Sequence, residues 1–465
     1  MGENSIKTYT LLVVTLASFM TAITGSAINL AIPAIGQEFQ SSTTFLSWVA
    51  TSYILACAAF LVPFGRLADI LGRRKIFLLG VSVFFLSSLL CSFAWSMASL
   101  ILFRIIQGIG AGMLFSTNMA ILTSVFSPQE RGRVFGINVA VVYAGLSFGP
   151  AIGGFLNHHF GWQSIFICTS ILALIVVSFT AFRLRGEWRG AAGEKFDLLG
   201  SFLYVLGITA FMYGISAITT SPAAKFIFFS GFIILLVFGF YEVRIQHPIM
   251  HLSLFRNITF AFSNLAAFIS YSATYALGFL LSLYLQEIQG YDSQMSGLIL
   301  LCQPVIMALL SPLSGTLSDR IEPRVLATLG MGISTVGLIP LSFLTPSTPI
   351  WLLILDLILL GVGFALFSSP NTNAVMSSVE IRYSGIASST LATMRMTGQA
   401  VSMAIVTLIM SIYLGNAQLT PSLHHNLLLS TKTTFAVFAL ICFGGTFASW
   451  ARGKKRTGEP TNQPL

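Results

Sequence analysis

Long apolar runs separated by short polar loops make up almost the whole chain. A helix needs about 20 apolar residues to cross the hydrocarbon core of a bilayer. Fourteen successive windows reach that length, at residues 9–33, 45–66, 76–95, 97–122, 134–157, 163–182, 198–218, 225–243, 258–286, 294–316, 325–345, 349–371, 385–414 and 430–450. The pattern therefore predicts an all-α integral membrane protein with fourteen transmembrane helices.

Basic residues follow this pattern in a regular way. One alternating set of loops and tails holds 20 of the 24 Lys and Arg residues, whereas the opposite set holds only Lys225 and Lys432. The remaining two, Arg104 and Arg395, fall inside windows. Because short cytoplasmic loops collect Lys and Arg, both termini are predicted to be cytoplasmic. A miscounted window would have destroyed the alternation.

The composition excludes several classes of protein. Hydrophobic residues make up 55% of the chain and charged residues only 8%, with a mean hydropathy of +0.85, which is far from a soluble domain. The net charge of +9 comes from short loops rather than from a basic domain, so we expect no nucleic-acid binding. The sequence has no P-loop, no metal-spaced His/Cys cluster and no nucleophile elbow. We therefore expect neither an enzyme nor a cofactor.

An internal repeat predicts how the helices are grouped. The loop GRLADILGRR at Gly65 returns as GTLSDRIEPR at Gly315, and Glu130 is echoed by Glu380, both at a shift of 250 residues. The repeat divides the chain into a six-helix half at 1–183, an inserted helix pair with its linkers at 184–257, a second six-helix half at 258–450 and a cytoplasmic tail at 451–465. Two related halves are the geometry of secondary transporters.

Three motifs carry a family resemblance. The first is the charged loop, with Gly65, Leu67, Asp69, Gly72, Arg73 and Arg74; the second is RIIQGIGAG in the fourth window, with Arg104, Gln107, Gly108 and Gly110; the third lies in the fifth window, with Gly145, Gly149, Pro150, Gly153 and Gly154. With these motifs the chain resembles a major facilitator superfamily transporter of the fourteen-span drug:proton antiporter type. The resemblance covers nearly the whole chain.

The charged loop and the fifth window have structural interpretations of their own. Gly65 and Gly72 permit tight turns, and Asp69 can accept hydrogen bonds from a neighbouring helix start. The resemblance implies a latch that closes the cytoplasmic side, with Arg73, Asp319 and Arg382 as partners; the alternative is a solvated turn. In the fifth window the glycines favour close helix contact and Pro150 bends the helix, so it acts as a hinge or simply as a packing face.

Ionisable residues inside the windows are the candidates for ion coupling. A central charge costs roughly 2.5 to 3.5 kcal/mol on insertion scales, and Arg104, Asp356 and Arg395 qualify. Aligning Leu114–Ser116 with Leu366–Ser368 maps Arg104 onto Asp356, so the two are expected at similar depth on opposite halves. We expect Asp356 to carry the proton, in an Arg–Asp system that biases the two states of the transporter. The alternative is a fixed structural pair of Asp356 with Arg395.

One position departs from the family pattern. The resemblance implies an acidic residue five positions before the Asn of N-x-A-x-P in the first window, and here Asn29, Ala31 and Pro33 match but the acidic position is Thr24. Either Asp356 replaces the missing carboxylate, or the coupling ion or transport mode differs.

Polar and aromatic residues in windows expected to face the centre are the candidate substrate ligands: Asn29, Gln107, Tyr271, Tyr275 and Gln303. Their aromatic rings would suit flat lipophilic cations, although hydrogen bonding between helices explains each residue equally well.

We therefore expect a monomeric, proton-driven exporter of amphipathic drugs or similar small molecules, spanning the cell membrane many times and conferring drug resistance. One alternative is an exporter or importer of a specific endogenous solute with altered coupling. A more distant one is a receptor or scaffold that does not transport.

Overall fold

The structure is a computed structural model that describes residues 3–184, 186–217, 221–246, 248–250, 252–379, 384–415 and 420–453. Within these ranges the regular secondary structure is helical, apart from an isolated bridge residue at Ser42. Fourteen helical segments are long and apolar enough to cross a membrane, so the predicted fold class and span count are confirmed. The predicted cytoplasmic location of the termini stays a prediction.

The first half of the chain contains seven α-helices and a short 3₁₀ turn. They are α1 (Glu3–Ala27), η1 (Ile28–Leu30), α2 (Ile32–Phe39), α3 (Thr43–Leu71), α4 (Arg73–Ser92), α5 (Met97–Val125), α6 (Pro128–Phe160) and α7 (Gln163–Phe182). Serine residues begin two of the long helices. At α5 the Ser96 hydroxyl accepts a hydrogen bond from the backbone N–H of Ser99, and at α6 the backbone N–H and hydroxyl of Ser127 donate to the Glu130 carboxylate.

The rest of the chain supplies the inserted pair and the second set of helices. They are α8 (Leu198–Ala217), α9 (Ala224–Glu242), η2 (Leu252–Arg256), α10 (Ile258–Thr274), α11 (Leu277–Leu283), the π-helical turn η3 (Tyr284–Ile288), α12 (Ser293–Leu300), α13 (Cys302–Arg320), α14 (Pro323–Leu341), α15 (Ile350–Ser377), α16 (Ser384–Leu414), η5 (Pro421–Leu423) and α17 (His424–Ala451).

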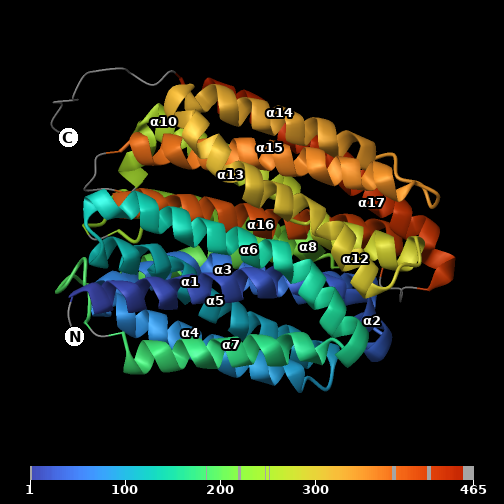
Figure 1. Cartoon of the computed structure of the whole chain (residues 1–465), viewed down its shortest axis with the longest axis horizontal. Coiled ribbons are helices and arrows are strands. Elements are labelled where there is room, and N and C mark those ends of the chain that lie inside the picture. Colours follow the sequence, from blue (N-terminus) through green and yellow to red (C-terminus); the bar gives the residue numbers. More distant parts are fainter. Residues whose placement is uncertain are drawn as a thin grey trace.

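The same helix pairings occur in both halves. In the first half α1 packs on α6, α3 and α4 pack on α5, and α4 packs on α7. In the second half α10 packs on α16, α13 and α14 pack on α15, and α14 packs on α17. Figure 1 shows the two groups one above the other, with α6 and α16 along their junction. This packing agrees with a pseudo-symmetric repeat, whereas the domain boundaries at 183, 257 and 450 stay predictions.

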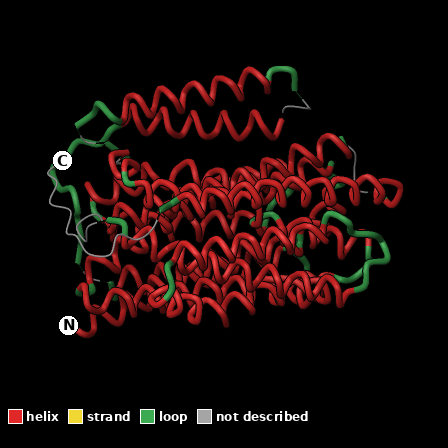
Figure 2. Tube along the Cα trace, turned by 90° about the horizontal axis from the view of Figure 1, so that it is seen from above, coloured by secondary structure: helices red, strands yellow, loops and turns green. Residues whose placement is uncertain are grey.

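The inserted pair lies at the periphery. Helix α8 packs on α9, α16 and α3, while α9 packs chiefly on α8 and buries only 17% of its apolar window. Figure 2 shows this pair along one side of the bundle. Because the outer face of α9 is almost entirely apolar, with Phe226, Phe229 and Phe240 exposed, it suits contact with lipid acyl chains.

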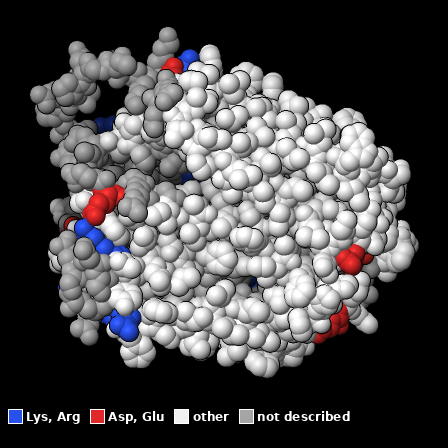
Figure 3. Space-filling model, in the orientation of Figure 1, with Lys and Arg blue, Asp and Glu red and all other residues white. Residues whose placement is uncertain are grey.

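Helix α1 begins and α17 ends at the same end of the bundle, which we call the terminal end; the opposite one is the far end (Figure 1). On the face shown in Figure 3, a broad and largely uncharged belt separates the charged side chains at the two ends. Such a belt is what the hydrocarbon core of a bilayer requires.

Candidate functional site

Three spans that approach the junction between the halves are interrupted. The first span breaks at η1. The ninth is interrupted between α10 and α11 at Tyr275 and Ala276 and contains the π-helical turn η3, and the tenth is divided between α12 and α13 at Leu301. Broken helices within a membrane protein are tolerated where they are buried in protein or line a solvent-filled passage, and they mark the binding regions of many transporters. The junction is therefore the first place to look for a transport site.

The halves meet closely at the far end. The Ser282 hydroxyl donates to the Asn29 carbonyl oxygen at 2.6 Å, and the hydroxyls of Ser47 and Thr407 are 2.9 Å apart. The Ser293 hydroxyl donates to the carbonyl oxygen of Gly154 at 3.2 Å. These contacts join α3 and the η1 and α6 regions of one half to the ninth, tenth and thirteenth spans of the other.

The glycine motif of the fifth span makes this closure possible. Gly145, Gly149 and Gly153 face α1, where an added Cβ would collide with Ala22, Ser26 and Ala27 respectively. Gly154 faces the other half, where a Cβ would overlap the backbone of Ser293. The carbonyl of Pro150 lies against Gly297 of α12. The motif thus lets α6 pack tightly on its own half and on the opposite half at once.

Contacts between the halves continue to mid-depth. The Tyr143 hydroxyl donates to the Ser368 hydroxyl at 3.1 Å, and Cys57 Sγ lies 3.9 Å from Met396 Sδ. Tyr143 also belongs to a small apolar cluster with Met307 and Phe364 of the second half. At the terminal end Lys7–Glu130 and Arg73–Asp69 each join residues of the first half, and Arg66 pairs with Glu194 of the linker to the inserted pair, so none of these described ion pairs connects the two halves. The structure is therefore of a state that is closed at the far end.

Arg104 is the central polar residue of the first half. It is only 1% exposed, its Nε donates to the Val49 carbonyl at 2.9 Å, and its guanidinium carbon lies 4.2 Å from the centre of the Tyr53 ring. A further N–H donates to Gln107, whose amide in turn donates to Ser88 at 2.7 Å. Gln107 therefore orients Arg104 instead of facing the junction. Tyr275 of the second half lies close enough to interact with Arg104 electrostatically.

Arg395 lies on α16 of the second half, at the twelfth position of that helix. Its Nη2 donates to the Thr372 hydroxyl at 2.6 Å, and its guanidinium lies 5.6 Å from the centre of the Tyr271 ring. The Tyr271 ring in turn meets Phe364 edge-on, with 5.3 Å between ring centres. Arg395 Nε is buried and has no hydrogen-bond partner. Arg395 and Tyr271 thus stand together at mid-depth.

Asp356 has no such partner. It is half-buried in the second turn of α15, and it makes no hydrogen bond or ion pair with any residue that the structure describes. Arg104 is the eighth residue of α5 and Asp356 the seventh of α15, so the two have similar places in helices that both start at the far end. The structure does not bring Asp356 together with Arg104 or Arg395.

The other candidate ligands differ in what they contact. The backbone carbonyl of Asn29 serves the far-end closure, and its side-chain amide lies beside Gly278. Gln303 is half-buried at the start of α13, and its carbonyl packs against Gly361. Thr24 is buried and its hydroxyl lies 3.2 Å from that of Thr169 on α7, so this position faces its own half.

The charged loop is covered by the linker to the inserted pair. Arg73 binds Asp69 with 2.7 Å between Nη2 and Oδ1, and donates to the Ser124 hydroxyl of α5 at 2.6 Å. The linker adds hydrogen bonds from Ala191 N to the Asp69 carbonyl and from Arg73 N to the Trp188 carbonyl. Gly72 has a φ of 127°, which favours glycine, whereas Gly65 packs beside Ser116.

Part of the predicted latch cannot be followed across the halves. Arg382 and the side chain of Asp319 lie outside the described residues. The described part of the latch joins the α3–α4 turn and α5 of the first half to the linker of the inserted pair.

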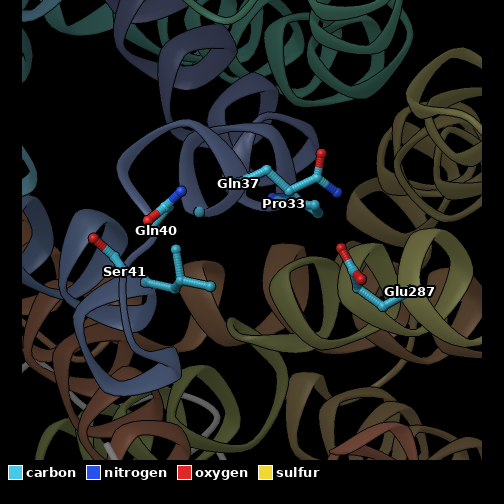
Figure 4. Close-up of a pocket in the computed structure, with 7 residues that line it drawn as sticks. Pro33, Gln37, Gln40, Ser41 and Glu287 are labelled. Atoms are coloured by element: carbon cyan, nitrogen blue, oxygen red, sulfur yellow. The ribbon is translucent and has the colours of Figure 1, made fainter. Parts of the chain in front are cut away.

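Sequence reasoning missed a carboxylate at the far end. Glu287 lies in η3 and lines a cavity of about 70 Å³ together with α2 and the start of α3. Figure 4 shows Glu287 and Gln37 on opposite sides of this cavity. Glu287 Oε2 is 3.9 Å from His424 Nε2 of α17. The only sequence signal was a Glu directly after the ninth window, which reads as a loop residue.

Arg452 was also misjudged. The sequence places it in a solvated tail, but it is 1% exposed and donates to Asn371 at 2.9 Å and to Ser449. Burial and nearby Arg324 lower the pKa of Arg452 to about 10. Its partner Asn371 lies 81 residues away in sequence, so no local pattern could have shown the burial.

Two helical repeats that meet around buried polar and aromatic residues, with interrupted spans at the junction, define a secondary transporter. The family follows from comparison: residues 14–403 and 263–464 match the model of the Major Facilitator Superfamily, and the chain belongs to that superfamily.

Relatives and solved structures agree with this assignment. The chain is 30% identical to the riboflavin transporter RibZ of Clostridioides difficile, covering 94% of this chain and 96% of that protein. It is 31% identical to the multidrug resistance protein Stp of Mycobacterium tuberculosis, covering 90% and 79%. A crystal structure of a bacterial homologue of the lysosomal transporter Spinster, inward-facing and unoccupied, superposes with a TM-score of 0.70 at 16% identity, covering 96% and 97% of the two chains. This similarity to the Spinster homologue shows a shared fold only.

Proposed function

We propose that this protein exports small amphipathic organic molecules across the cell membrane by alternating access, driven by a proton gradient. The observation that carries the proposal is the junction itself: the halves are in contact from the far end to mid-depth, and buried polar and aromatic side chains from both halves end there. Relatives named for multidrug and methylenomycin resistance support export as the direction.

The proposed cycle alternates between this state and one that is open at the far end. The far-end contacts combine hydrogen bonds and glycine-mediated packing with a buried apolar cluster that includes residues of both halves, such as Leu46 and Leu280, so opening requires this cluster to divide between the halves. A proton biases the two states only if a carboxylate has a different proton affinity in each of them. Asp356, which has no partner here, and Glu287, which lines the far-end cavity, are the two carboxylates that fit this requirement.

The first test is transport by purified protein in liposomes with an imposed pH gradient, using riboflavin, fluorescein and rhodamine 123 as fluorescent probes. We expect uptake of at least one probe that a protonophore abolishes, and loss of that pH-driven uptake in Asp356→Asn or Glu287→Gln. Asp292→Asn is the matched control, because Asp292 is exposed at the same end and Asn still caps α12.

Each possible outcome tests a different part of the proposal. Equal pH-driven uptake in both variants would remove these carboxylates from the mechanism. Uptake that ignores the gradient would contradict proton coupling while leaving transport intact. No transport of any probe would favour the receptor or scaffold alternative.

A second candidate is transport, in either direction, of one specific endogenous solute. The relative named as a riboflavin transporter supports it, since it matches the chain almost from end to end. Saturable transport of riboflavin without transport of either fluorescein or rhodamine 123 would select this candidate. Because both halves of the junction come from one chain, we also propose a monomer, which light scattering of the purified protein tests directly.

A further inference from the structure

Two guanidinium groups enter the junction from opposite halves, and neither is paired with a carboxylate. Arg104 is held by a carbonyl, an amide oxygen and an aromatic face. Arg395 is held by one hydroxyl and one aromatic face. Neither makes an ion pair with a residue that the structure describes, and a membrane-embedded charge is costly unless it has a partner or a function. The charge of this region is therefore positive.

Helix α3 provides a scale for the distance between the two groups. Arg104 binds the Val49 carbonyl, and Met396, the neighbour of Arg395, contacts Cys57. Val49 and Cys57 are eight residues apart on α3, which corresponds to roughly 12 Å of helix rise. Arg104 and the segment of α16 that carries Arg395 thus contact the same helix at different depths.

Aromatic rings and unused hydrogen-bond donors line the interval. Tyr53 lies under Arg104 and Tyr271 under Arg395. The Tyr53 hydroxyl is buried without a hydrogen-bond partner, and so is Arg395 Nε. Other buried donors among the described residues also have no partner, Arg324 Nε among them, but these two belong to the Arg–Tyr pairs at the junction, where an acceptor on a bound molecule would satisfy them.

The same electrostatics argue against a cationic ligand. Two uncompensated positive charges in a region of low dielectric repel a cation more strongly than aromatic faces attract it. Charge-assisted bonds from guanidinium to an oxyanion are among the strongest available. The sequence expectation of flat lipophilic cations therefore conflicts with the charges at the junction.

We propose that the junction binds a planar aromatic oxyanion, with its acidic group on Arg395 and its ring system extending past Tyr271 and Tyr53 toward Arg104. This inference rests on the proposed transport function and names the substrate class for that site. A carboxylate, sulfonate or phosphate group can each accept hydrogen bonds from the Arg395 guanidinium. The proposed site therefore selects a negative charge attached to a flat ring system and not one particular acid.

Two dyes on one scaffold test the charge preference. Fluorescein and rhodamine 123 share the xanthene ring system, but the first is an anion and the second a cation near pH 7.5. Binding to the full chain in lipid nanodiscs is measured by fluorescence anisotropy. We expect fluorescein to bind at least about tenfold more tightly than rhodamine 123, because charged hydrogen bonds to a desolvated guanidinium are worth that much or more.

Variants of Arg395 separate binding from folding. Arg395→Gln is expected to weaken fluorescein binding about tenfold while leaving rhodamine 123 unchanged or tighter, and Arg395→Lys to recover part of the loss. The control is Arg324→Gln, because Arg324 stacks on Trp450 at 4.3 Å, away from the junction. A misfolded protein would lose both dyes, so a change in preference cannot come from unfolding.

The possible results distinguish the proposed substrate class from the proposed transport function. Equal or tighter binding of rhodamine 123 by the unmodified protein, or unchanged binding of fluorescein by Arg395→Gln, overturns the inference. In liposomes, pumping of rhodamine 123 without fluorescein would leave the proposed export function standing and refute the substrate class. Selective fluorescein binding without any transport would support the site and refute the export function.

Discussion

Removing a single hydroxyl should shift the balance between the two states of the transporter. Ser282 is fully buried, and its Oγ donates to the Asn29 carbonyl of the opposite half at 2.6 Å. This bond must break when the far end opens. Ser282→Ala removes it only from the closed state, so the far-end-open state becomes more populated.

The expected change in the ratio of open to closed molecules follows from the net free energy of one hydrogen bond. A buried intramolecular hydrogen bond contributes about 1 kcal/mol net, which is about a fivefold change in the ratio of open to closed molecules. The carbonyl left without its donor in the closed state adds to the penalty, while in the open state water can satisfy it. We therefore expect a change of about fivefold or somewhat more.

Spin labels across the far end give the ratio directly. Trp95, before α5, and Phe343, after α14, are both exposed and lie on different halves. Labels at these positions, in a background free of the native cysteines, report short and long distances by double electron–electron resonance. The matched control is Ser272→Ala, because Ser272 is on the same span and equally buried but donates within its own helix, to Phe268 at 2.8 Å. A ratio in Ser282→Ala that does not exceed that of Ser272→Ala refutes the reasoning.

Three further predictions concern packing, a buried charge and a surface pair. Gly154→Leu places a side chain against the backbone of the opposite half, so the same distance measurement should show loss of the far-end-closed state; an unchanged distribution would contradict the role given to this glycine. Arg452→Ala leaves the side-chain oxygen Oδ1 of Asn371 without its buried hydrogen-bond donor. This substitution should lower the unfolding free energy by about 2 kcal/mol, measured by reversible unfolding in mixed micelles. The pKa of Glu130 is lowered to about 2 by hydrogen bonds from Ser127 and Lys7, so its stabilising charge is present above the ordinary carboxyl pKa and lost only as the pH falls toward 2. Glu130→Gln should therefore change the melting temperature equally at pH 5 and pH 8, and a difference between the two would show that another group titrates there.

Features governed by local sequence were predicted well. The fourteen spans follow from runs of apolar residues that any bilayer would select, and the structure has the same number. The spacing of Gly145, Gly149 and Gly153 at four residues put them on one helix face and indicated close packing, which the structure shows against α1. Local spacing could not say which helix they would meet.

The geometry of the candidate site depends on contacts between residues far apart in the sequence, which no local pattern predicts. The sequence identified Arg104 as an intramembrane charge. Its expected proximity to Asp356 came from the internal repeat, which predicts how deep each residue lies in the membrane but not toward which neighbouring helix its side chain points. Its actual neighbours, Val49 and Tyr53, lie some fifty residues earlier, and Arg104 is 55 residues from Val49. Thr24 likewise proved to face Thr169 of its own half.

Taken by itself, the sequence determined that this chain spans a membrane fourteen times, that it is built from a repeat, and which residues bring charge into the apolar region, because hydrophobicity and spacing act over one or two helical turns. Only the tertiary structure decided that Arg104 and Arg395 both border one junction without a carboxylate partner among the described residues, that Glu287 lines a far-end cavity and that Arg452 is buried. The physical reason is that the environment of a polar side chain in a membrane protein is set by the helices packed around it. Those helices come from distant parts of the chain.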